Sequence, residues 1–589
     1  MAPPVLGVRD LTIRFGTHAG TPPVVDRASL ELAPGEIHGL VGESGSGKTM
    51  IARAVLGLLP PGAQIAGGSI AFRGRELTAM PAAEMRRLRG GEIGMIFQEP
   101  MMSLNPALTI GVQMAEAMRL HTPATRAAIR AQSIAMLERV QMPDPAGCLA
   151  RYPHEFSGGM RQRIMLASVL MLRPKLLLAD EPTTALDVLI QKEVLEIMLE
   201  IVRDLGTAVL LITHDLGLVA RYCQAVTVLR RGVVVERGPV AERLARPQHP
   251  YTRELLAALP RRPETPGTTA GDVRTPPLVE VRDLEVTFAK KAMLPWRRAH
   301  VVRAVDGVSF TIRPRETLAV VGESGSGKTT LGRAILRLVE KSGGRLLVDG
   351  RDTDGLGNAA LRELRREMQI VFQDPYSSLD PRQRIGRIVG EGLRLVPGLS
   401  ATERKARVAR ILAEVGIEPD WSRRFPHELS GGQRQRIGIA RAIVSRPRLV
   451  VADEAVSALD LTVQAQVLEL LKRLQARFEF SYLFITHDLG VVEQIADRVI
   501  VMYRGRIVEM APADGLFDRP HHPYTCELLN AVPELAGNAE HGYRLAQREH
   551  LVPPPPAGMR VDQRYAGRGD APVSLIEVTP GHVAAYSPG

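Results

Sequence analysis

The chain has 589 residues, a formal net charge of +11 and a pI near 9.8, with 45% apolar and 24% charged residues. This composition is typical of a globular protein with several domains and excludes an intrinsically disordered chain. No stretch has the run of uncharged apolar residues that predicts a transmembrane helix, and the first ten residues lack the features of a secretory signal. We therefore expect a cytoplasmic protein whose membrane role comes through a partner.

The positive charge does not by itself indicate nucleic acid. The chain has 9 lysines and 66 arginines, and the arginines are scattered along it without a basic tail or an aromatic-interleaved basic stripe. Cys148, Cys223 and Cys526 lie far apart, which excludes a disulfide framework and CxxC metal spacing. We expect no nucleic-acid partner, and isolated thiols in a reducing compartment.

One set of motifs occurs twice in the chain. The pairs are VGESGSGKT at 41–49 and 321–329, IFQEP at 96–100 and VFQDP at 371–375, PHEFSGGMRQRI at 153–164 and PHELSGGQRQRI at 426–437, LLLADEPTTALD at 176–187 and LVVADEAVSALD at 449–460, LLITHDLGLV at 210–219 and LFITHDLGVV at 483–492, and HPYT at 249–252 and 522–525. The constant order predicts two copies of one domain rather than a solenoid of small repeats.

The boundaries of the two copies follow from composition. Residues 1–259 form the first predicted domain, and residues 260–277, rich in Pro, Gly and Thr, form a linker. Residues 278–535 form the second domain, and residues 536–589, with four consecutive prolines, form an extended and loosely ordered C-terminal tail.

Each copy alternates short, continuously apolar runs with helical patterns. Apolar runs without a polar face predict parallel strands covered by helices on both sides, so we expect an α/β fold with a mostly parallel sheet. The stretches 124–140 and 401–415 are mostly helical and predict an inserted helical subdomain.

A glycine-rich loop follows the first apolar run of this kind in each copy and opens a helix. Its G-x-x-x-x-G-K-T pattern is that of a phosphate-binding P-loop, in which backbone N–H groups, a lysine and a hydroxyl bind phosphates and Mg²⁺. A glycine-rich turn that contains lysine by chance is disfavoured, because two of only nine lysines occupy this position. The predicted nucleotide-binding residues are Gly42, Glu43, Ser44, Gly45, Ser46, Gly47, Lys48 and Thr49, and Gly322, Glu323, Ser324, Gly325, Ser326, Gly327, Lys328 and Thr329.

Two acidic residues end another apolar run in each copy. Asp180 and Asp453 are predicted to hold Mg²⁺ together with Thr49 and Thr329, and Glu181 and Glu454 are predicted to polarise an attacking water as general bases.

A glutamine and a histidine complete the predicted chemistry. Gln98 and Gln373 are expected to contact Mg²⁺ and water and to transmit the nucleotide state to a partner. His214 and His487 end a further apolar run, and the repeat favours a contact with the γ-phosphate over a buried structural histidine.

A second anion-binding element precedes another helix in each copy. Ser157, Gly158 and Gly159 in the first copy, and Ser430, Gly431 and Gly432 in the second, place a helix N-terminus where phosphate can bind. Its distance in sequence from the P-loop suggests that the two elements of one copy serve different nucleotides.

The order P-loop, FQ, SGG, DE, ALD and H resembles the ABC ATPases over nearly the whole of both halves. The resemblance implies tandem P-loop NTPase domains that bind ATP and Mg²⁺ between them, head to tail, so that one fused pair replaces a heterodimer. In that arrangement Lys48, Asp180, Glu181 and His214 face Ser430 and Gly432, whereas Lys328, Asp453, Glu454 and His487 face Ser157 and Gly159, with Asp187 and Asp460 at the seam. It also suggests Phe15 and Phe288 as adenine-stacking residues, with core packing as an equal alternative.

The two copies depart from each other in two places. The first copy has Met160 where the second has Gln433, and the second has Ala455 where the first has Pro182. Neither change removes a phosphate ligand or a base, so we expect two hydrolytic sites, with the Lys328 site the slower one because it would use the FSGGM segment.

The HPYT-x-x-LL pattern at 249–256 and 522–529 is similar to that of the oligopeptide, dipeptide and nickel importer ATPases. The similarity implies an ATPase on the cytoplasmic face of the inner membrane, peripheral to two permease subunits that work with an extracytoplasmic substrate-binding protein. Peptide is the default cargo, and glutathione, nickel, a metallophore or an opine remain open. HPYT alone is equally compatible with a structural turn.

Four further hypotheses are weighed. A soluble tandem ABC ATPase acting on ribosomes or nucleic acid is disfavoured by the short linker, and a module without turnover is disfavoured by the two glutamates. No iron–sulfur cluster is expected, because no cysteine follows Cys526. His521 and His522 are expected to be exposed near a turn rather than to bind nickel.

Overall fold

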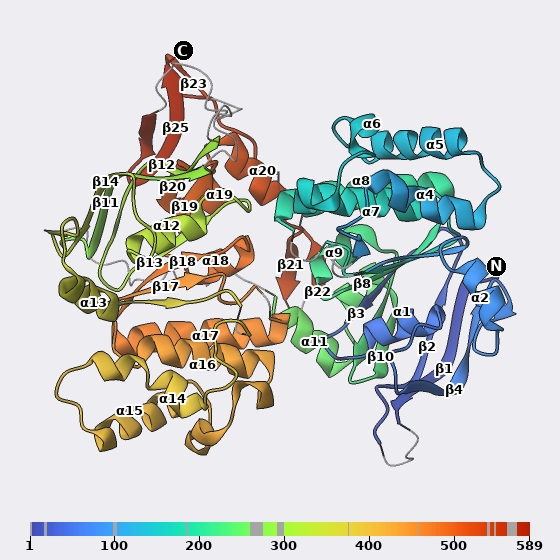
Figure 1. Ribbon diagram of the computed structural model, residues 1–589, viewed down its shortest axis with the longest axis horizontal. Coiled ribbons are helices and arrows are strands. Elements are labelled where there is room, and N and C mark those ends of the chain that lie inside the picture. The colour runs from blue at the N-terminus through green and yellow to red at the C-terminus, as the bar shows by residue number, and fades with distance from the viewer. Residues whose placement is uncertain are drawn as a thin grey trace. The chain divides into compact units, whose positions relative to one another are not determined.

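The computed structural model describes residues 3–16, 21–97, 103–183, 186–259, 275–290, 300–374, 376–457, 459–538, 542–546, 549–561 and 574–588. They form two compact units. Unit 1 comprises residues 1–259 with the short segments 460–462 and 533–547, and unit 2 comprises residues 260–459, 463–532 and 548–589. Each sequence copy thus supplies most of one unit, shown from blue to green and from green to red in Figure 1.

Unit 1 contains an antiparallel sheet of order β2-β1-β4-β5 and a six-stranded sheet of order β10-β9-β3-β8-β7-β6, in which only the β9–β10 pair is antiparallel. The strands are β1 (Leu6–Phe15), β2 (Val25–Leu32), β3 (Ile37–Val41), β4 (Ala63–Phe72), β5 (Arg75–Glu76), β6 (Ile93–Ile96), β7 (Leu176–Asp180), β8 (Ala208–Thr213), β9 (Ala225–Arg230) and β10 (Val233–Pro239).

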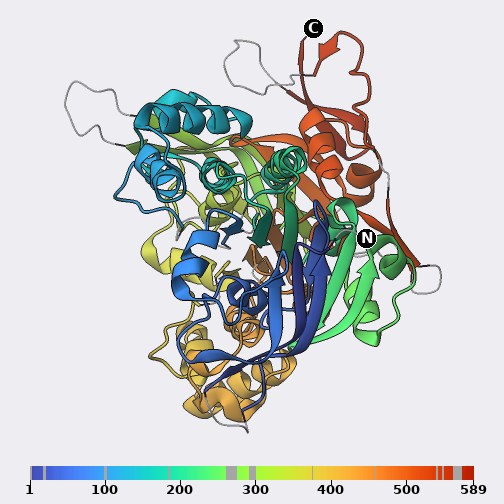
Figure 2. The same cartoon turned by 90° about the vertical axis from the view of Figure 1, so that its right-hand side faces the viewer.

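The helices of this part of the chain are α1 (Lys48–Val55), α2 (Ala82–Leu88), α4 (Ile110–His121), α5 (Arg126–Arg139), α6 (Pro145–Cys148), η1 (Pro153–Glu155), α7 (Gly158–Leu170), α8 (Val188–Leu205), α9 (Leu216–Tyr222), α10 (Val240–Ala245) and α11 (Pro250–Ala257). Helices α4 to α7 gather beside the sheet, as the two views in Figures 1 and 2 show, and α5 lies where the sequence predicts the inserted helical subdomain.

The continuous apolar runs form central strands that are covered on both faces. In β7, Leu177 and Ala179 belong to the core shared with the inserted helices, whereas Leu176 and Leu178 belong to the core shared with α1 and the antiparallel sheet. Successive side chains of a strand point to opposite faces, so a strand buried on both faces needs apolar residues throughout. The predicted α/β fold with a mostly parallel sheet is confirmed.

Unit 2 repeats this plan, with an antiparallel sheet of order β12-β11-β14-β15 and a larger sheet that begins β16-β17-β18-β13-β19-β20. The strands of the second half of the chain are β11 (Val279–Lys290), β12 (His300–Ile312), β13 (Thr317–Val321), β14 (Gly343–Val348), β15 (Arg351–Asp352), β16 (Met368–Val371), β17 (Leu449–Asp453), β18 (Ser481–Ile485), β19 (Arg498–Tyr503) and β20 (Arg506–Pro512). Its helices are α12 (Lys328–Ile335), α13 (Asn358–Glu367), α14 (Ile385–Val389), η2 (Gly392–Leu395), α15 (Ala401–Glu414), η3 (Pro419–Arg423), η4 (Pro426–Glu428), α16 (Gly431–Ile443), α17 (Leu461–Phe478), α18 (Leu489–Ile495), α19 (Ala513–Asp518) and α20 (Pro523–Ala531).

The C-terminal tail is more structured than its composition suggests. It contains β23 (Met559–Arg560), β24 (Ser574–Thr579) and β25 (His582–Pro588), and β25 pairs antiparallel with β20 at Glu509↔Ala584 and Met510↔Val583. The side chain of His582 lies 2.6 Å from Oε1 of Glu509, and both groups are buried. The prolines and glycines around β25 favour a loose tail by composition, and the strand that pairs with β25 lies about 70 residues away in the sequence.

A second part of the tail belongs to unit 1. The hairpin of β21 (Leu535–Asn538) and β22 (Gly542–Leu545) falls within the segment 533–547, and Tyr543 is buried in the apolar core of that unit with Leu244. This placement was not predicted, because the hairpin's partners are more than 250 residues away along the chain.

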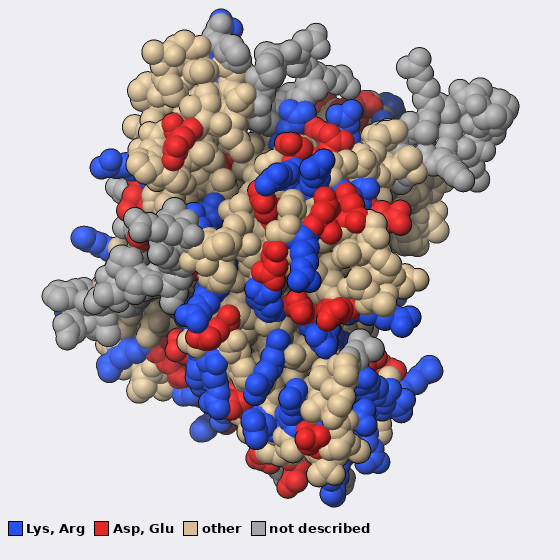
Figure 3. Space-filling view, turned by 90° about the vertical axis from the view of Figure 1, so that its left-hand side faces the viewer, with Lys and Arg blue, Asp and Glu red and all other residues tan. Residues whose placement is uncertain are grey.

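Charged groups of both signs are mixed on the surface. On the face shown in Figure 3, arginines and lysines alternate with aspartates and glutamates over the described residues. Within those residues no helix combines the length and the apolar character that a bilayer crossing requires.

The His582–Glu509 contact generates a test of the tail's structural role. His582→Ala removes one partner of a buried carboxylate, which we expect to cost about 1–3 kcal/mol of folding free energy. Within the described part of the chain, the other hydrogen bonds to Glu509 come from the backbone N–H groups of His521 and His522. Amide exchange in β20 and β25 should accelerate roughly 5- to 150-fold. The exposed His427→Ala is the control, and equal exchange rates in both variants would contradict the prediction.

Candidate functional site

The glycine-rich loop of unit 1 connects the end of β3 to the start of α1. Gly42 has φ 155°, and a Cβ atom there would lie 2.2 Å from the carbonyl oxygen of Leu229 in β9. Gly47, at φ 102°, caps α1, so the backbone turns directly into a helix N-terminus. In unit 2, a Cβ atom at Gly322 would lie 2.1 Å from the carbonyl oxygen of Met502. The predicted strand–loop–helix context is therefore present in both copies.

The loop lysines are buried beneath their own loops. Nζ of Lys48 donates to the carbonyl oxygens of Gly42 and Glu43 at 2.7 and 2.8 Å, and Lys328 makes the same two bonds in unit 2 at 2.7 Å each. Burial lowers the pKa of Lys48, and the surrounding carboxylates, Glu181 foremost, oppose this shift. A buried lysine ammonium group at a helix N-terminus is suited to bind a polyanionic ligand.

A threonine and an aspartate meet next to each lysine. Oγ1 of Thr49 donates to Oδ1 of Asp180 at 3.1 Å, and Thr329 donates to Asp453 at 2.9 Å. Burial raises the pKa of both aspartates, which the threonine hydrogen bonds partly offset. A hydroxyl and a carboxylate side by side are the hard oxygen donors that Mg²⁺ prefers, so these pairs fit a magnesium site.

The glutamate after each aspartate sits on a strained backbone. Glu181 has φ 46° and Glu454 has φ 49°, in the left-handed region that costs a residue with a side chain about 1 kcal/mol or more. Their N–H groups bond to the carbonyl oxygens of Ile212 and Ile485, at 2.9 and 2.8 Å, which anchors them to the neighbouring strand. Strain of this kind is concentrated at functional sites.

The predicted histidines lie beside these glutamates. Nδ1 of His214 is 3.4 Å from Oε1 of Glu181, and Nδ1 of His487 is 3.4 Å from Oε1 of Glu454. The hydrogen bond to Glu181 raises the pKa of His214 despite the opposing effect of burial. His214 is 45% exposed at its side chain, so it is not the buried core histidine of the alternative interpretation.

The glutamine joins the same cluster in unit 2. Nε2 of Gln373 donates to Oε2 of Glu454 at 2.7 Å. Burial favours the neutral form of Glu454, but the hydrogen bond and charge of His487, with the charge of Lys328, outweigh it and lower the pKa of Glu454. The carboxylate is therefore held ionised, as a general base requires. Gln98, its predicted counterpart, lies outside the described residues.

The SGG segments begin two helices of 13 residues, α7 and α16. The hydroxyl oxygens of Ser157 and Ser430 accept from the N–H groups three residues later, each at 3.4 Å. In unit 2, Oε1 of Gln433 also accepts from the N–H of Ser430 at 3.0 Å, which completes a capping box. The side chain of Met160 has no oxygen that could accept this hydrogen bond, and it packs against the apolar core instead. The sequence difference thus changes how the helix start is held.

The second difference between the copies, Pro182 in unit 1 and Ala455 in unit 2, does not change the hydrogen bonding. Nε2 of Gln435 in α16 donates to the carbonyl oxygen of Ala455 at 2.5 Å, and Gln162 in α7 donates to the carbonyl oxygen of Pro182. Because the acceptor is a backbone atom, proline and alanine serve equally. The bond couples the SGG helix of each unit to the residue after its glutamate.

The two phenylalanines proposed for base stacking lie at or near the ends of β1 and β11. Phe15 is 41% exposed and Phe288 is 47% exposed. The exposed rings are available for stacking, and the alternative of core packing does not hold.

The HPYT segments contact the P-loops, which sequence reasoning left undecided. The hydroxyl of Tyr251 accepts from the N–H of Glu43 at 3.2 Å, and that of Tyr524 accepts from the N–H of Glu323 at 2.9 Å. Burial raises the pKa of Tyr251 to about 12, so the phenol stays neutral. The available signal was the recurrence of tyrosine at the same place in both copies.

A buried glutamate fixes each HPYT segment. Glu236 accepts from the N–H groups of Gln248 and His249 at 2.9 and 3.1 Å, and Glu509 accepts from those of His521 and His522 at 2.7 and 3.0 Å. The histidines at 249 and 522 then cap α11 and α20. The expectation that His522 is exposed was wrong: its side chain is 2% exposed, whereas His249, which caps α11 in the same way, is partly buried.

Neither the cysteines nor a side-chain cluster suggests another metal site in the described part of the chain. Cys148, Cys223 and Cys526 are free and buried, and burial raises the pKa of Cys148 to about 11 and that of the other two to about 12. No group of three or more His, Cys, Asp or Glu residues there has a metal-binding arrangement.

Comparison with known proteins agrees with this geometry. The ABC transporter family model matches residues 25–184 and 305–457, and the model of the oligopeptide/dipeptide transporter C-terminal region matches 235–277 and 508–563. The chain is 48% identical to the peptidoglycan transport ATP-binding protein YejF of Agrobacterium fabrum, covering 90% of this chain and 96% of that protein. It is 44% identical to the glutathione import ATP-binding protein GsiA of Escherichia coli O157:H7, covering 99% and 96%. The chain belongs to the ABC transporter family, as an ATP-hydrolysing, ATP-binding component of an importer.

Proposed function

We propose that this chain drives the import of di- or oligopeptides by hydrolysing ATP at two sites. The observation that carries the proposal is that each unit joins a P-loop to an HPYT segment through a tyrosine hydrogen bond. The region matched by the peptide-transporter model is thereby attached to the nucleotide site itself. The name of YejF favours peptide fragments as cargo, and the name of GsiA makes glutathione, which is itself a tripeptide, the second candidate.

In the proposed mechanism, each side chain of the site has one role. Lys48 and Lys328 bind the β- and γ-phosphates, and the Thr49–Asp180 and Thr329–Asp453 pairs hold Mg²⁺, which neutralises phosphate charge when bound. Glu181 and Glu454 accept a proton from the attacking water, and His214 and His487 contact the γ-phosphate. Phe15 and Phe288 stack on adenine.

Each ATP is completed by the SGG segment of the other half of the chain. Ser157 and Ser430 are exposed at the starts of their helices, where N–H groups and the helix dipole favour an anion. Two phosphate groups, each gaining hydrogen bonds to charged groups worth about 1.5–3 kcal/mol apiece, supply the roughly 5.5 kcal/mol needed to reverse a 1:99 equilibrium. ATP binding therefore favours a closed pair, and hydrolysis releases it.

The chain works with two permease subunits and an extracytoplasmic binding protein, on the inner face of the inner membrane. The membrane-crossing part of the pathway is supplied by these partners. The mixed charges in Figure 3 give little reason to favour nucleic acid over a membrane assembly.

Cargo is tested by reconstitution. The chain is purified with its membrane subunits, placed in vesicles and supplied with the binding protein. We expect ATP-dependent uptake of labelled tetrapeptide, lost in Lys48→Ala/Lys328→Ala. Uptake of glutathione alone would favour the second candidate, and copurification with ribosomes instead of membrane subunits would refute the importer role.

The two sites are tested by removing each base. Because the Lys328–Glu454 site uses the segment with Met160, we expect it to be the slower site. Glu454→Gln should therefore keep more than half of the ATP turnover, and Glu181→Gln should keep less than half. The double variant should lose at least about 100-fold of the turnover. Glu138→Gln, on the exposed face of α5, is the control. Complete loss from Glu181→Gln alone would contradict independent sites.

The Glu181–His214 contact predicts a pH dependence. The pKa of His214 should exceed the ordinary histidine value of 6.5, and it should fall in the Glu181→Gln variant. NMR titration of the histidine rings measures both values, and the exposed His154 serves as an internal control. Because the folded-state pKa is raised, the contact stabilises the protein fully below about pH 6.5 and is lost as the pH rises through the folded-state value. An unchanged pKa in the variant would show that the hydrogen bond is not its cause.

A further inference from the structure

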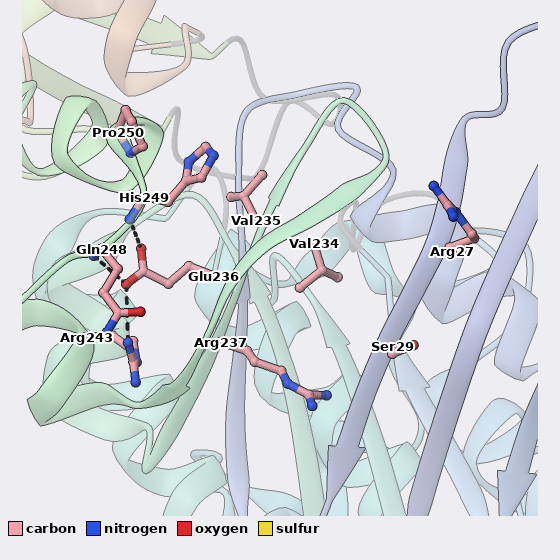
Figure 4. Close-up of a pocket in the computed structure, with 10 residues that line it drawn as sticks. All are labelled: Arg27, Ser29, Val234, Val235, Glu236, Arg237, Arg243, Gln248, His249 and Pro250. Carbon is pink, nitrogen blue, oxygen red and sulfur yellow. Dashed lines mark hydrogen bonds and ion pairs between the residues drawn. The ribbon is translucent and has the colours of Figure 1, made fainter.

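A basic cavity lies beside β10 of unit 1. Its volume is about 570 Å³, and Figure 4 shows the side chains around it, including those of Arg27 from β2, Arg237 from β10 and Arg243 from α10. Arg243 is 14% exposed at its side chain, with Nη2 2.9 Å from Glu242 and Nη1 3.8 Å from Glu236. Its Nε atom is buried and has no hydrogen-bond partner among the described residues.

The residues that line the cavity include three arginines and one acidic residue, Glu236, while Glu242 and Asp26 pair with Arg243 and Arg27 beside it. Both oxygens of Glu236 already accept backbone N–H groups, as described above. Arg27 lies 3.6 Å from Asp26, in an exposed pair that stabilises little. A ligand that enters here meets three guanidinium groups.

The second copy of the domain shows what occupies the same place. The residues of unit 2 that correspond to Arg27, Arg237 and Arg243 are Gly307, Met510 and Leu516. There the strand β25 pairs with β20 at Glu509 and Met510, the counterparts of Glu236 and Arg237. In unit 1, β10 is the terminal strand of its sheet among the described residues. The copy with three arginines is thus the copy whose strand edge lacks this added strand.

We propose that β10 and its cavity bind an extended acidic segment of a partner protein, which adds to the sheet as β25 does in unit 2. Backbone hydrogen bonds along β10 would supply affinity, and a carboxylate opposite Arg237 would supply specificity. An unpaired strand edge is a template for such addition, and the arginines repel basic segments.

The test uses a probe taken from the chain itself. In the peptide of residues 574–588, Val583 is the residue that pairs with Met510, so Val583→Glu places a carboxylate opposite Arg237 if the peptide adds to β10 in the same register. By fluorescence anisotropy with the full-length protein, the Glu peptide should bind at least tenfold more tightly than the unchanged one. Amide exchange of residues 233–239 should slow in the complex.

Two protein variants locate the binding. Arg27→Gly/Arg237→Met takes both residues from unit 2, and Arg27 has φ 47°, where glycine is unstrained, so the fold should be retained. This variant should weaken binding at least tenfold. Arg9→Gln/Arg303→Gln removes two arginines that are 75% and 66% exposed in surface ion pairs and should change binding less than twofold.

Three results would overturn the proposal. The first is equal affinity of the protein for the two peptides, and the second is an equal loss of binding in both protein variants. The third is displacement of the peptide by inorganic phosphate, if the phosphate no longer displaces it when Arg27 and Arg237 are replaced. The last result would identify a small-anion site instead.

Discussion

The close approach of the P-loop to the neighbouring strand sets the geometry of both nucleotide sites. At Gly42 and Gly322 the backbone passes so near a carbonyl oxygen of the next strand that no Cβ atom fits. The loop can then turn directly into a helix whose first residue is Lys48 in unit 1 and Lys328 in unit 2. Threonine follows the lysine and reaches the aspartate at the end of a parallel strand that one other strand separates from the P-loop strand. One steric constraint therefore brings together groups that lie about 130 residues apart in sequence.

The same loop is held from its other side by the tyrosine of the HPYT segment. That segment is fixed by a glutamate in the last strand of the repeated sheet, through two backbone N–H groups in each unit. A movement of this segment would change the position of the loop backbone at Glu43 or Glu323. The C-terminal region of each copy thus helps to hold the P-loop of that copy in place.

Much of this could be read from the sequence, because the repeated motifs fix both the residues and their order along the chain. The parallel strands, the inserted helices and the Thr–Asp and Glu–His contacts agree with what the motifs predict. The role of Tyr251 could not be predicted, since a hydrogen bond from a phenol to a distant backbone N–H leaves no periodic signal. The strand β25 and the burial of Tyr543 were missed for a related reason: both depend on tertiary partners, and the surrounding composition indicates a loose tail.

Comparison of the two copies separates what the fold requires from what one copy has added. Glu236 and Glu509 make the same backbone hydrogen bonds, so they serve the shared fold. Around them the copies diverge: His582 approaches Glu509 on an added strand, whereas Arg243 approaches Glu236 beside an open cavity. The buried carboxylate is thus accompanied by a cationic or hydrogen-bonding group in both units, but only unit 2 obtains it from its own C-terminus. In unit 1 the arginine approaches the carboxylate, and no strand among the described residues pairs with the outer edge of β10, which is the edge at which we propose that an acidic segment binds.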